Sequence, residues 1–218
     1  MLRQRIGIPM GTNCAVFVAN FFCFTYEYAF IERLVTGGHT VLLSQFRYTL
    51  RYIDDLLSGA NPEFSNYLSE SYVDANGIRG IYPSFLTVTS EQDSTTHVSF
   101  LDTYVMFEGG RWFTKLYDKR EHPPLSRVKS KKYPHVSCFL SDRSKYGIIT
   151  SRLYSISRVC QRKSDFVERS RIFLTEFGGR GYRIQQIRSF VVRFLKTVPI
   201  QFPIRSRRAL LEAMMPKR

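Results

Sequence analysis

The sequence predicts an α+β fold in which a helix, antiparallel strands and a β-hairpin are followed by a helical, strongly basic region. Apolar residues recur at helical spacing from Val16 to Val35. Two β-rich runs flank a glycine-containing turn at 108–110. After residue 149, apolar residues return at helical spacing and continue to Phe194. Strands in the first half and helices in the second are typical of an α+β protein.

The first helix is expected to begin at Thr12 or Asn13, either of which can cap it, and to end at Gly37–Gly38. Its apolar residues at helical spacing are Val16, Phe17, Phe21, Phe24, Tyr28, Ile31 and Val35. The next expected elements are strands over 40–52 and 55–60, a helix over 62–72 and a strand over Leu86–Val88.

A β-hairpin is expected from Val98–Phe107 and Arg111–Tyr117. The composition then turns basic and proline-bearing from Asp118 to Pro134, which indicates a linker. The predicted organisation is therefore three segments, 1–120, 121–197 and 198–218.

The second segment is expected to be helical. Ile149, Leu153, Ile156 and Cys160 form one apolar seam. A helix Ser164–Phe177, capped by Ser164 and closed by Gly178–Gly179, should precede an amphipathic helix Tyr182–Lys196. The Pro- and Arg-rich residues 198–218 are expected to form a loosely ordered tail.

Charge is distributed unevenly along the chain. The net charge is +14, but residues 1–110 carry −5 and residues 111–218 carry +19, and every lysine lies in the second part. An excess this large would repel itself in a compact fold without a polyanionic partner. The asymmetry indicates an acidic working site followed by a surface for nucleic acid, although a solvated basic face alone is the simpler alternative.

Several classes of protein are disfavoured. The four cysteines and four histidines show neither CxxC pairs nor zinc-finger spacing, which favours a reducing, intracellular compartment. The uncharged stretch Ile6–Tyr26 contains Gly7, Pro9 and Gly11, so we expect no membrane span.

Asp54 and Asp55 are adjacent carboxylates at the expected strand turn. Such a pair can bind hard divalent cations through oxygen ligands, and phosphoryl transfer uses these ions to neutralise phosphates and activate the attacking hydroxyl. Solvated aspartates are also common in turns, so the dipeptide alone is weak evidence. Its context is more specific.

Three motifs in order resemble the reverse transcriptases of eukaryotic retroelements, most closely the Penelope-like kind. They are Gly7–Ile8–Pro9–Met10–Gly11, Tyr52–Ile53–Asp54–Asp55 and Phe100–Leu101–Asp102. The run from Thr114 to Arg120 is also similar to the segment that follows the family's hairpin. The resemblance extends to about Thr197 and implies a partial polymerase palm over 1–120 and a helical thumb over 121–197.

The resemblance implies roles for individual residues. Asp54 and Asp55 would be catalytic and bind Mg²⁺ or Mn²⁺. Gly7, Pro9, Met10, Gly11 and Tyr52 would shape the nucleotide and template pocket, although Tyr52 could equally pack in the core. Phe100, Leu101, Asp102 and Lys115 would support the primer, with Asp102 structural rather than a metal ligand. The partners implied are an RNA template, a DNA primer or duplex, and deoxynucleoside triphosphates.

The sequence also departs from the family pattern. Val16 stands where these elements usually have proline, and Asn20 where they usually have aspartate. The family's fingers and a further catalytic aspartate, expected before Met1, are not in this sequence. We therefore expect the isolated chain to polymerise poorly, because metal clamping would be incomplete.

The basic helices are predicted to grip nucleic acid. Their Gly178–Gly181 connection resembles a helix-turn-helix, but a polymerase thumb must follow any sequence, so backbone contacts are expected. The candidate contacts are Arg152, Arg158, Arg162, Arg180, Arg183 and Arg188. Arg205, Arg207, Arg208, Lys217 and Arg218 could form a nuclear-targeting or RNA-binding patch. The alternative function is a non-catalytic nucleic-acid-binding protein.

Overall fold

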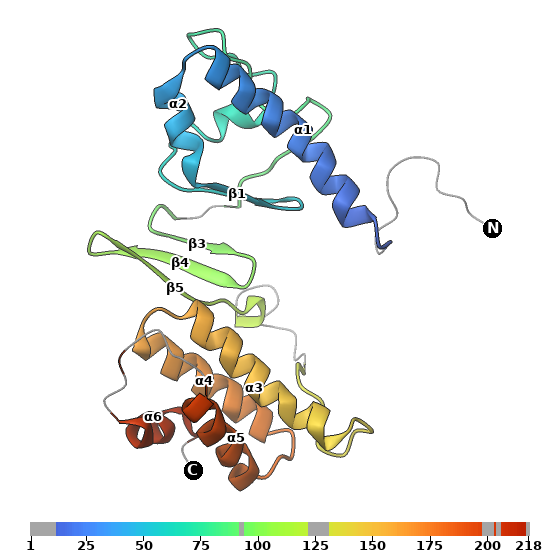
Figure 1. The fold of residues 1–218 in the computed structure, drawn as a ribbon, viewed down its shortest axis with the longest axis vertical. Helices are drawn as coiled ribbons and strands as arrows, with labels where there is room; N and C mark the ends of the chain where they lie inside the picture. Colours follow the sequence, from blue (N-terminus) through green and yellow to red (C-terminus); the bar gives the residue numbers. More distant parts are fainter. Residues whose placement is uncertain (1–11, 92–93, 122–130, 198–202, 204–205, 217–218) are drawn as a thin grey trace, which may run out of the picture. The chain divides into compact units, whose positions relative to one another are not determined.

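The computed structural model describes residues 12–91, 94–121, 131–197, 203 and 206–216. It has the predicted α+β class, with antiparallel strands followed by a C-terminal helical region (Figure 1). The chain forms two compact units, residues 1–92 and 93–218. The expected residues Gly7, Pro9, Met10 and Gly11 lie outside the described part of the chain, as do Arg205, Lys217 and Arg218.

The elements of the first unit are α1 (Ala15–Thr36), α2 (Thr40–Gln45), the 3-10 turn η1 (Phe46–Tyr48), β1 (Thr49–Tyr52), β2 (Asp55–Ser58) and the 3-10 turn η2 (Asn66–Leu68). Those of the second unit are β3 (His97–Phe100), β4 (Thr103–Glu108), β5 (Arg111–Leu116), the 3-10 turn η3 (Lys119–Glu121), α3 (Asp142–Val159), α4 (Lys163–Gly178), α5 (Ile184–Thr197) and α6 (Arg207–Met214).

The core of the first unit is small and aromatic. Phe30 and Leu34 of α1 are buried against Phe46, whose ring centroid lies 5.0 Å from that of Phe30. Tyr67 and Tyr82 close the cluster from the turns after β2. This core packs the C-terminal half of α1 against η1 and the turns after β2.

The apolar residues predicted at helical spacing on α1 do not form its core-facing side. Phe17, Phe21, Phe24, Tyr28 and Val35 are all more than half exposed. The residues that pack inward are Phe30 and Leu34, with Cys23 and Tyr26 partly buried. The helix is apolar on several sides, so spacing alone could not identify the buried one.

Three further predictions in this unit are wrong. Residues 40–48 are helical instead of extended. The prediction failed because a short apolar run such as Val41–Leu43 is compatible with either a helix or a strand. Only η2 is helical within 62–72, and Ser69 and Val73 instead form isolated bridges with Tyr82 and Arg79. No strand forms over Leu86–Val88.

The predicted hairpin is present in the second unit but is part of a three-stranded antiparallel sheet, β3–β4–β5. The expected strand 98–107 is broken at Leu101, which has φ 55°, so that Phe100 pairs with Thr103 across a tight turn. The β4–β5 turn has φ 57° at Gly109 and 76° at Gly110, which suits a two-residue type I′ hairpin.

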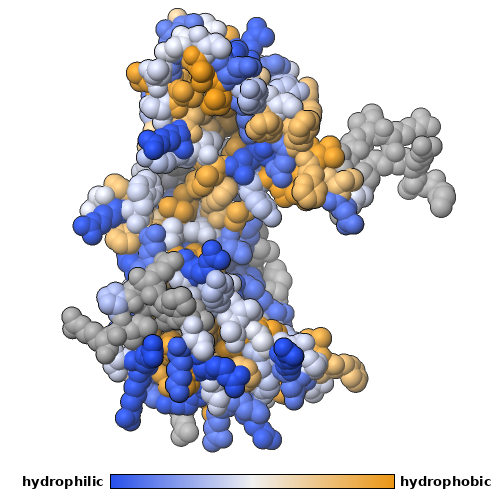
Figure 2. Space-filling model, in the orientation of Figure 1, coloured by the Kyte–Doolittle hydropathy of each residue, from blue (hydrophilic) through white to orange (hydrophobic). Residues whose placement is uncertain are grey.

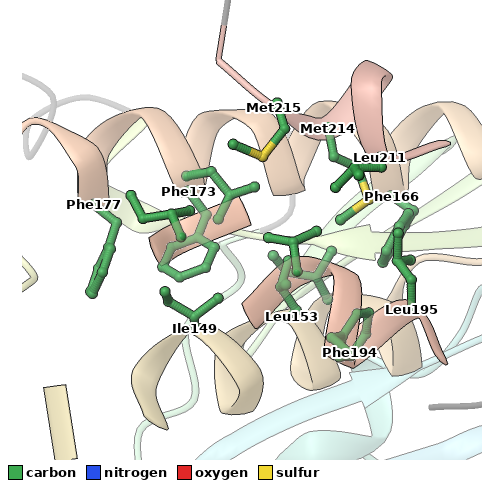
Figure 3. Close-up of a cluster of buried hydrophobic side chains, with 14 of the residues drawn as sticks. Ile149, Leu153, Phe166, Phe173, Phe177, Phe194, Leu195, Leu211, Met214 and Met215 are labelled. Atoms are coloured by element: carbon green, nitrogen blue, oxygen red, sulfur yellow. The ribbon is translucent and has the colours of Figure 1, made fainter. Parts of the chain in front are cut away.

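The helices of the second unit share one continuous core (Figure 3). The predicted seam is confirmed, since Ile149, Leu153, Ile156 and Cys160 are fully buried. The capping prediction is wrong, because α4 begins at Lys163 after Arg162 and includes Ser164 in its first turn. The last residues are not a loose tail throughout, because Leu210, Leu211 and Met214 anchor α6 in this core.

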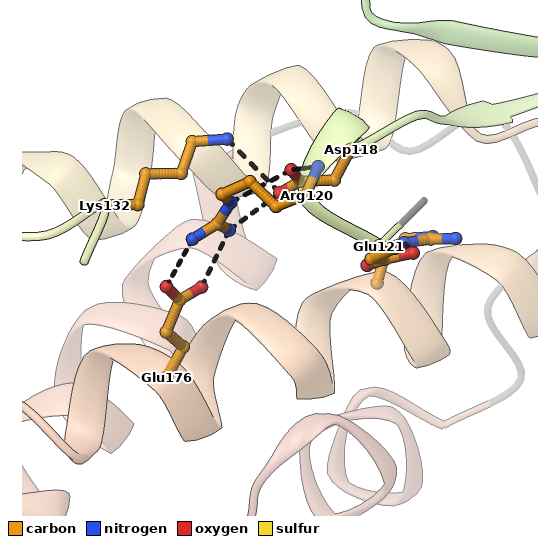
Figure 4. A network of polar contacts seen from close by, with 6 residues as sticks. Asp118, Arg120, Glu121, Lys132 and Glu176 are labelled. Atoms are coloured by element: carbon orange, nitrogen blue, oxygen red, sulfur yellow. Dashed lines mark hydrogen bonds and ion pairs between the residues drawn. The ribbon is translucent and has the colours of Figure 1, made fainter. Parts of the chain in front are cut away.

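The three-stranded sheet belongs to the same unit as the helices. Thr114 of β5 donates a hydrogen bond from Oγ1 to the Val159 carbonyl at 2.6 Å, and Gln161 N–H donates to the Thr114 carbonyl at 3.1 Å. After β5, Arg120 joins Asp118 and Glu176 in an ion-pair network (Figure 4). The compact units divide between residues 92 and 93, and the segment boundary expected at residue 120 stays a prediction.

Candidate metal and nucleic-acid site

The adjacent carboxylates lie at the tip of the β1–β2 hairpin. Tyr52 pairs with Asp55, so Ile53 and Asp54 are the two central residues of the turn. Ile53 has φ 57°, a rare conformation for a β-branched residue that stores local strain. Both carboxylates are exposed to solvent. The strand pairing therefore presents two acidic side chains outward at one point.

Arg51 ties this turn to α1. Its guanidinium donates to Glu27 Oε1 at 2.6 Å, to Asn20 Oδ1 at 2.6 Å and to the Ile53 carbonyl at 3.1 Å. The Arg51 side chain is only 13% exposed. A planar fork with five donors can hold these acceptors together, whereas a lysine ammonium cannot.

We call this set of hydrogen-bonded groups the Arg51 network; it consists of Arg51, Asn20, Glu27, Tyr82 and the Ile53 carbonyl. Within it, Glu27 accepts hydrogen bonds from both Arg51 and Tyr82. Tyr82 donates from its hydroxyl to Glu27 Oε1 at 2.5 Å. Burial and this hydrogen bond raise the pKa of Tyr82 well above its usual range. The phenol therefore stays a donor to Glu27, and the same carboxylate accepts the hydrogen bonds that fix Arg51 behind the turn.

The donor set of the turn fits a magnesium ion in part. Carboxylate oxygens are hard ligands, and Mg²⁺ is commonly bound by one or two carboxylates completed by waters and substrate phosphates. Within the described residues, no group of three or more Asp, Glu, His or Cys side chains gathers at one point. Asp54 and Asp55 would therefore hold such an ion only together with ligands from elsewhere.

Tyr52 is 55% exposed, so its ring is not a core residue and is open to a ligand beside the carboxylates. This removes the core-packing alternative for Tyr52, while its contact with a nucleotide stays a prediction.

The expected primer-supporting residues lie in the second unit. Phe100 ends β3, Leu101 and Asp102 form the turn, and the Asp102 carbonyl accepts the Tyr117 N–H at 2.8 Å. Lys115 lies over the Tyr104 ring with Nζ 5.4 Å from its centroid. Asp102 thus has a backbone role in ordering the turn. These residues and Asp54 belong to different compact units.

The six candidate arginines divide into two groups. Arg162 pairs with Asp165 and Glu108, Arg180 donates to the Tyr133 carbonyl at 2.9 Å, and Arg188 pairs with Glu212. These three side chains have structural partners. Arg152 is half-buried, while Arg158 and Arg183 are exposed. Arg183, directly before α5, is an exposed candidate for a phosphate contact.

The polar side of α5 and α6 carries further exposed cations. Ile187, Val191, Phe194 and Leu195 bury the opposite side of α5. The exposed basic residues on these two helices and at their ends are Arg183, Arg188, Arg193, Lys196, Arg207 and Arg208, which we call the basic face. Figure 2 shows many hydrophilic residues on the visible face of this unit. Lys196 was not a sequence candidate, although its helical spacing from Arg193 and Arg188 could have indicated it.

Comparisons with protein-family models, with curated proteins and with solved structures each gave no match. In the part of the chain that the structure describes, no helix is both long and apolar enough to cross a membrane.

Proposed function

We propose that this chain is part of a reverse transcriptase of a eukaryotic retroelement, whose family activity is template-directed DNA synthesis by two-metal nucleotidyl transfer. The observation that carries the proposal is the exposed Asp54–Asp55 pair on a hairpin turn that Arg51 fastens to α1. The order of the three motifs supports it. The setting proposed with this function is intracellular, with the nucleus preferred.

The proposed ligands follow from the donor set. Asp54 and Asp55 would hold Mg²⁺ or Mn²⁺, which would neutralise the phosphates of a deoxynucleoside triphosphate and activate the primer hydroxyl. The exposed Tyr52 ring next to the turn would contact the nucleotide, and the basic face would hold the template–primer duplex by its phosphates. Because the described residues bring only two carboxylates together at this turn, we expect the isolated chain to extend a primer weakly or not at all.

Paramagnetic broadening by Mn²⁺ tests the metal part of the proposal without depending on activity. At low Mn²⁺, the NMR signals of the amides of Ile53, Asp54 and Asp55 should broaden before other signals. Asp54→Ala should abolish this selective effect, because it removes one of two hard ligands. Glu32→Ala removes an exposed carboxylate from α1 of the same unit and should leave it unchanged. Equal broadening in wild type and Asp54→Ala would refute the proposed metal site.

Primer extension gives the complementary test of chemistry. Any Mg²⁺-dependent extension by the wild-type chain should disappear in Asp54→Ala. Synthesis that persists in this variant would show that the activity resides elsewhere.

A second candidate is a non-catalytic nucleic-acid-binding protein, favoured by the basic face alone. This function predicts salt-dependent affinity for nucleic acid that is the same in wild type and Asp54→Ala. Affinity for DNA with no Asp54-dependent broadening by Mn²⁺ would favour this candidate over the polymerase.

A further inference from the structure

The loop before α3 is held firmly against the connection between α4 and α5. Val136 N–H donates to the Arg180 carbonyl at 3.0 Å, and the Tyr182 hydroxyl donates to the Pro134 carbonyl at 3.2 Å. Lys145, whose side chain is 8% exposed, donates to the Val136 carbonyl at 2.7 Å. Gly181 permits this close approach, because a Cβ at that position would lie only 2.9 Å from Val136 Cγ1 and would clash with it.

The distal part of this loop is ordered by its own hydrogen bonds. Cys138 N–H donates to the His135 carbonyl at 3.0 Å, which closes a turn. Ser141 then caps α3 by accepting the Ser144 N–H at 3.2 Å. The chain between these two turns is therefore fixed at both ends.

Phe139 projects from this ordered segment. Its relative exposure is 109%, the highest among the exposed large apolar side chains of the described residues, and the adjacent Leu140 is 52% exposed. Single exposed apolar residues are common, but an aromatic ring completely in solvent contributes nothing to the core. Here it is presented by a loop whose backbone hydrogen bonds restrict its motion.

The surroundings of Phe139 are basic. Residues 131–145 contain four Lys or Arg and one acidic residue, and residues 178–188 contain three Arg and none. His135 and Arg143 flank the ring in sequence, and both are exposed. Arg183 follows the connection on which the loop is anchored and is also exposed. Charge thus favours a polyanion beside the ring over an uncharged apolar partner.

We propose that Phe139 stacks on an unpaired nucleobase, in a single-stranded stretch or at the open end of a duplex, while the neighbouring cations contact the phosphates. The inference rests on the nucleic-acid binding in the proposed function and names a base contact that the function does not require. Stacking on an aromatic side chain suits a protein that must accept any sequence, since every base has a π-face.

The test uses the full chain and a fluorescein-labelled oligothymidylate, titrated in EDTA so that no metal or triphosphate is involved. Phe139→Ala should weaken binding roughly 5- to 150-fold, in line with the loss of one base stack. Phe139→Trp should retain the affinity because it keeps an aromatic face. Phe139→Leu should lose most of it, because it keeps only the apolar surface.

The salt dependence separates stacking from charge. Phe139→Ala removes no cation, so the slope of log K against log salt should stay at the wild-type value. Ile172→Ala truncates another exposed apolar side chain, 43% exposed on α4, and should leave both affinity and slope unchanged. Emission of 2-aminopurine placed in the oligonucleotide should be quenched by wild type and by Phe139→Trp but not by Phe139→Ala.

Each alternative outcome has a distinct meaning. Wild-type affinity in Phe139→Ala or in Phe139→Leu would overturn the stacking proposal, and so would absence of any binding to the oligonucleotide. Phe139-dependent sedimentation with phosphatidylserine vesicles, without effect on the oligonucleotide, would assign the residue to a membrane surface and also overturn it. Failure of the polymerase proposal is recognised separately, by unselective Mn²⁺ broadening in a chain that still binds the oligonucleotide through Phe139.

Discussion

At the scale of single residues, the most consequential contact joins Arg51 to the turn that carries the carboxylates. Its guanidinium links Glu27 and Asn20 on α1 to the Ile53 carbonyl. Since Ile53 is held at φ 57°, the turn is strained and needs contacts that hold it. The Arg51 network supplies them.

Arg51→Lys should lower the stability of the first unit by about 2 kcal/mol, because charged hydrogen bonds to partly buried acceptors are lost. Amide hydrogen exchange at Ile53, Asp54 and Asp55 should accelerate. Arg47→Lys, a change of the same kind at an exposed arginine of η1, is the matched control and should have little effect. Unchanged exchange at the turn in Arg51→Lys would show that the strands alone hold it.

The carboxylates of the turn could be predicted from the sequence, whereas the partners of the arginines could not. The position of Asp54 and Asp55 at a strand turn was predicted, because turn and strand signals are local. The pairing of Arg51 with Glu27, 24 residues apart, was not, because it depends on how α1 packs beside the hairpin. Arg162, Arg180 and Arg188 were predicted to contact phosphates, but composition cannot show which cations already have partners in the fold.

At the scale of elements, the Arg120 network fastens the chain after β5 to α4 (Figure 4). Arg120 Nη2 contacts Asp118 Oδ2 at 2.7 Å, Arg120 Nη1 contacts Glu176 Oε1 at 2.7 Å, and Lys132 lies 3.4 Å from Asp118. Arg169 and Glu121 form a separate pair nearby at 2.6 Å. The hydrogen bonds from Arg120 hold the pKa of the Asp118 carboxyl well below its usual range.

This lowered pKa predicts a dependence of stability on pH. A carboxyl whose folded pKa is depressed stabilises the fold above its unfolded pKa of about 3.9 and loses that contribution as the pH falls toward the folded value. The free energy of unfolding of the wild type should therefore drop by about 2 kcal/mol more than that of Asp118→Asn between roughly pH 5 and pH 2. Urea denaturation across this range measures it. Asp142→Asn, at a largely exposed carboxylate, should follow the wild type, and parallel curves for Asp118→Asn would contradict the assignment.

Predictability at this scale follows the strength of local signals. The hairpin around Gly109–Gly110 and the helices α3, α4 and α5 combine strong periodicity with glycine or capping signals, and all of them form. The turns η1 and η2 are short, and tertiary contacts such as that between Phe46 of η1 and Tyr67 of η2 decide the structure of such segments. The helix α6 was missed because flanking prolines and arginines mask the apolar Leu210, Leu211 and Met214.

At the scale of the whole molecule, the division of charge along the chain is the dominant physical feature. Residues 1–110 carry −5 and residues 111–218 carry +19, and the basic face of α5 and α6 lies wholly within the positive part. Hydrophobic burial on the other side of α5 fixes which side of the helix the cations occupy. The sequence predicted the sign and place of this charge, and the fold adds which residues remain exposed.

If the basic face binds nucleic acid, affinity should depend on where cations are removed and not only on the net charge. Replacing Arg183 and Arg193 with Gln should reduce the slope of log K against log salt by about 2 for duplex DNA, since about one counterion is released per phosphate contact. The matched control replaces Arg47 and Arg79, two exposed arginines of the first unit, with Gln. It removes the same charge and should leave the slope almost unchanged. Equal losses in the two double variants would mean that nucleic acid responds to the overall charge of the molecule, and the basic face would then have no special role as a binding surface.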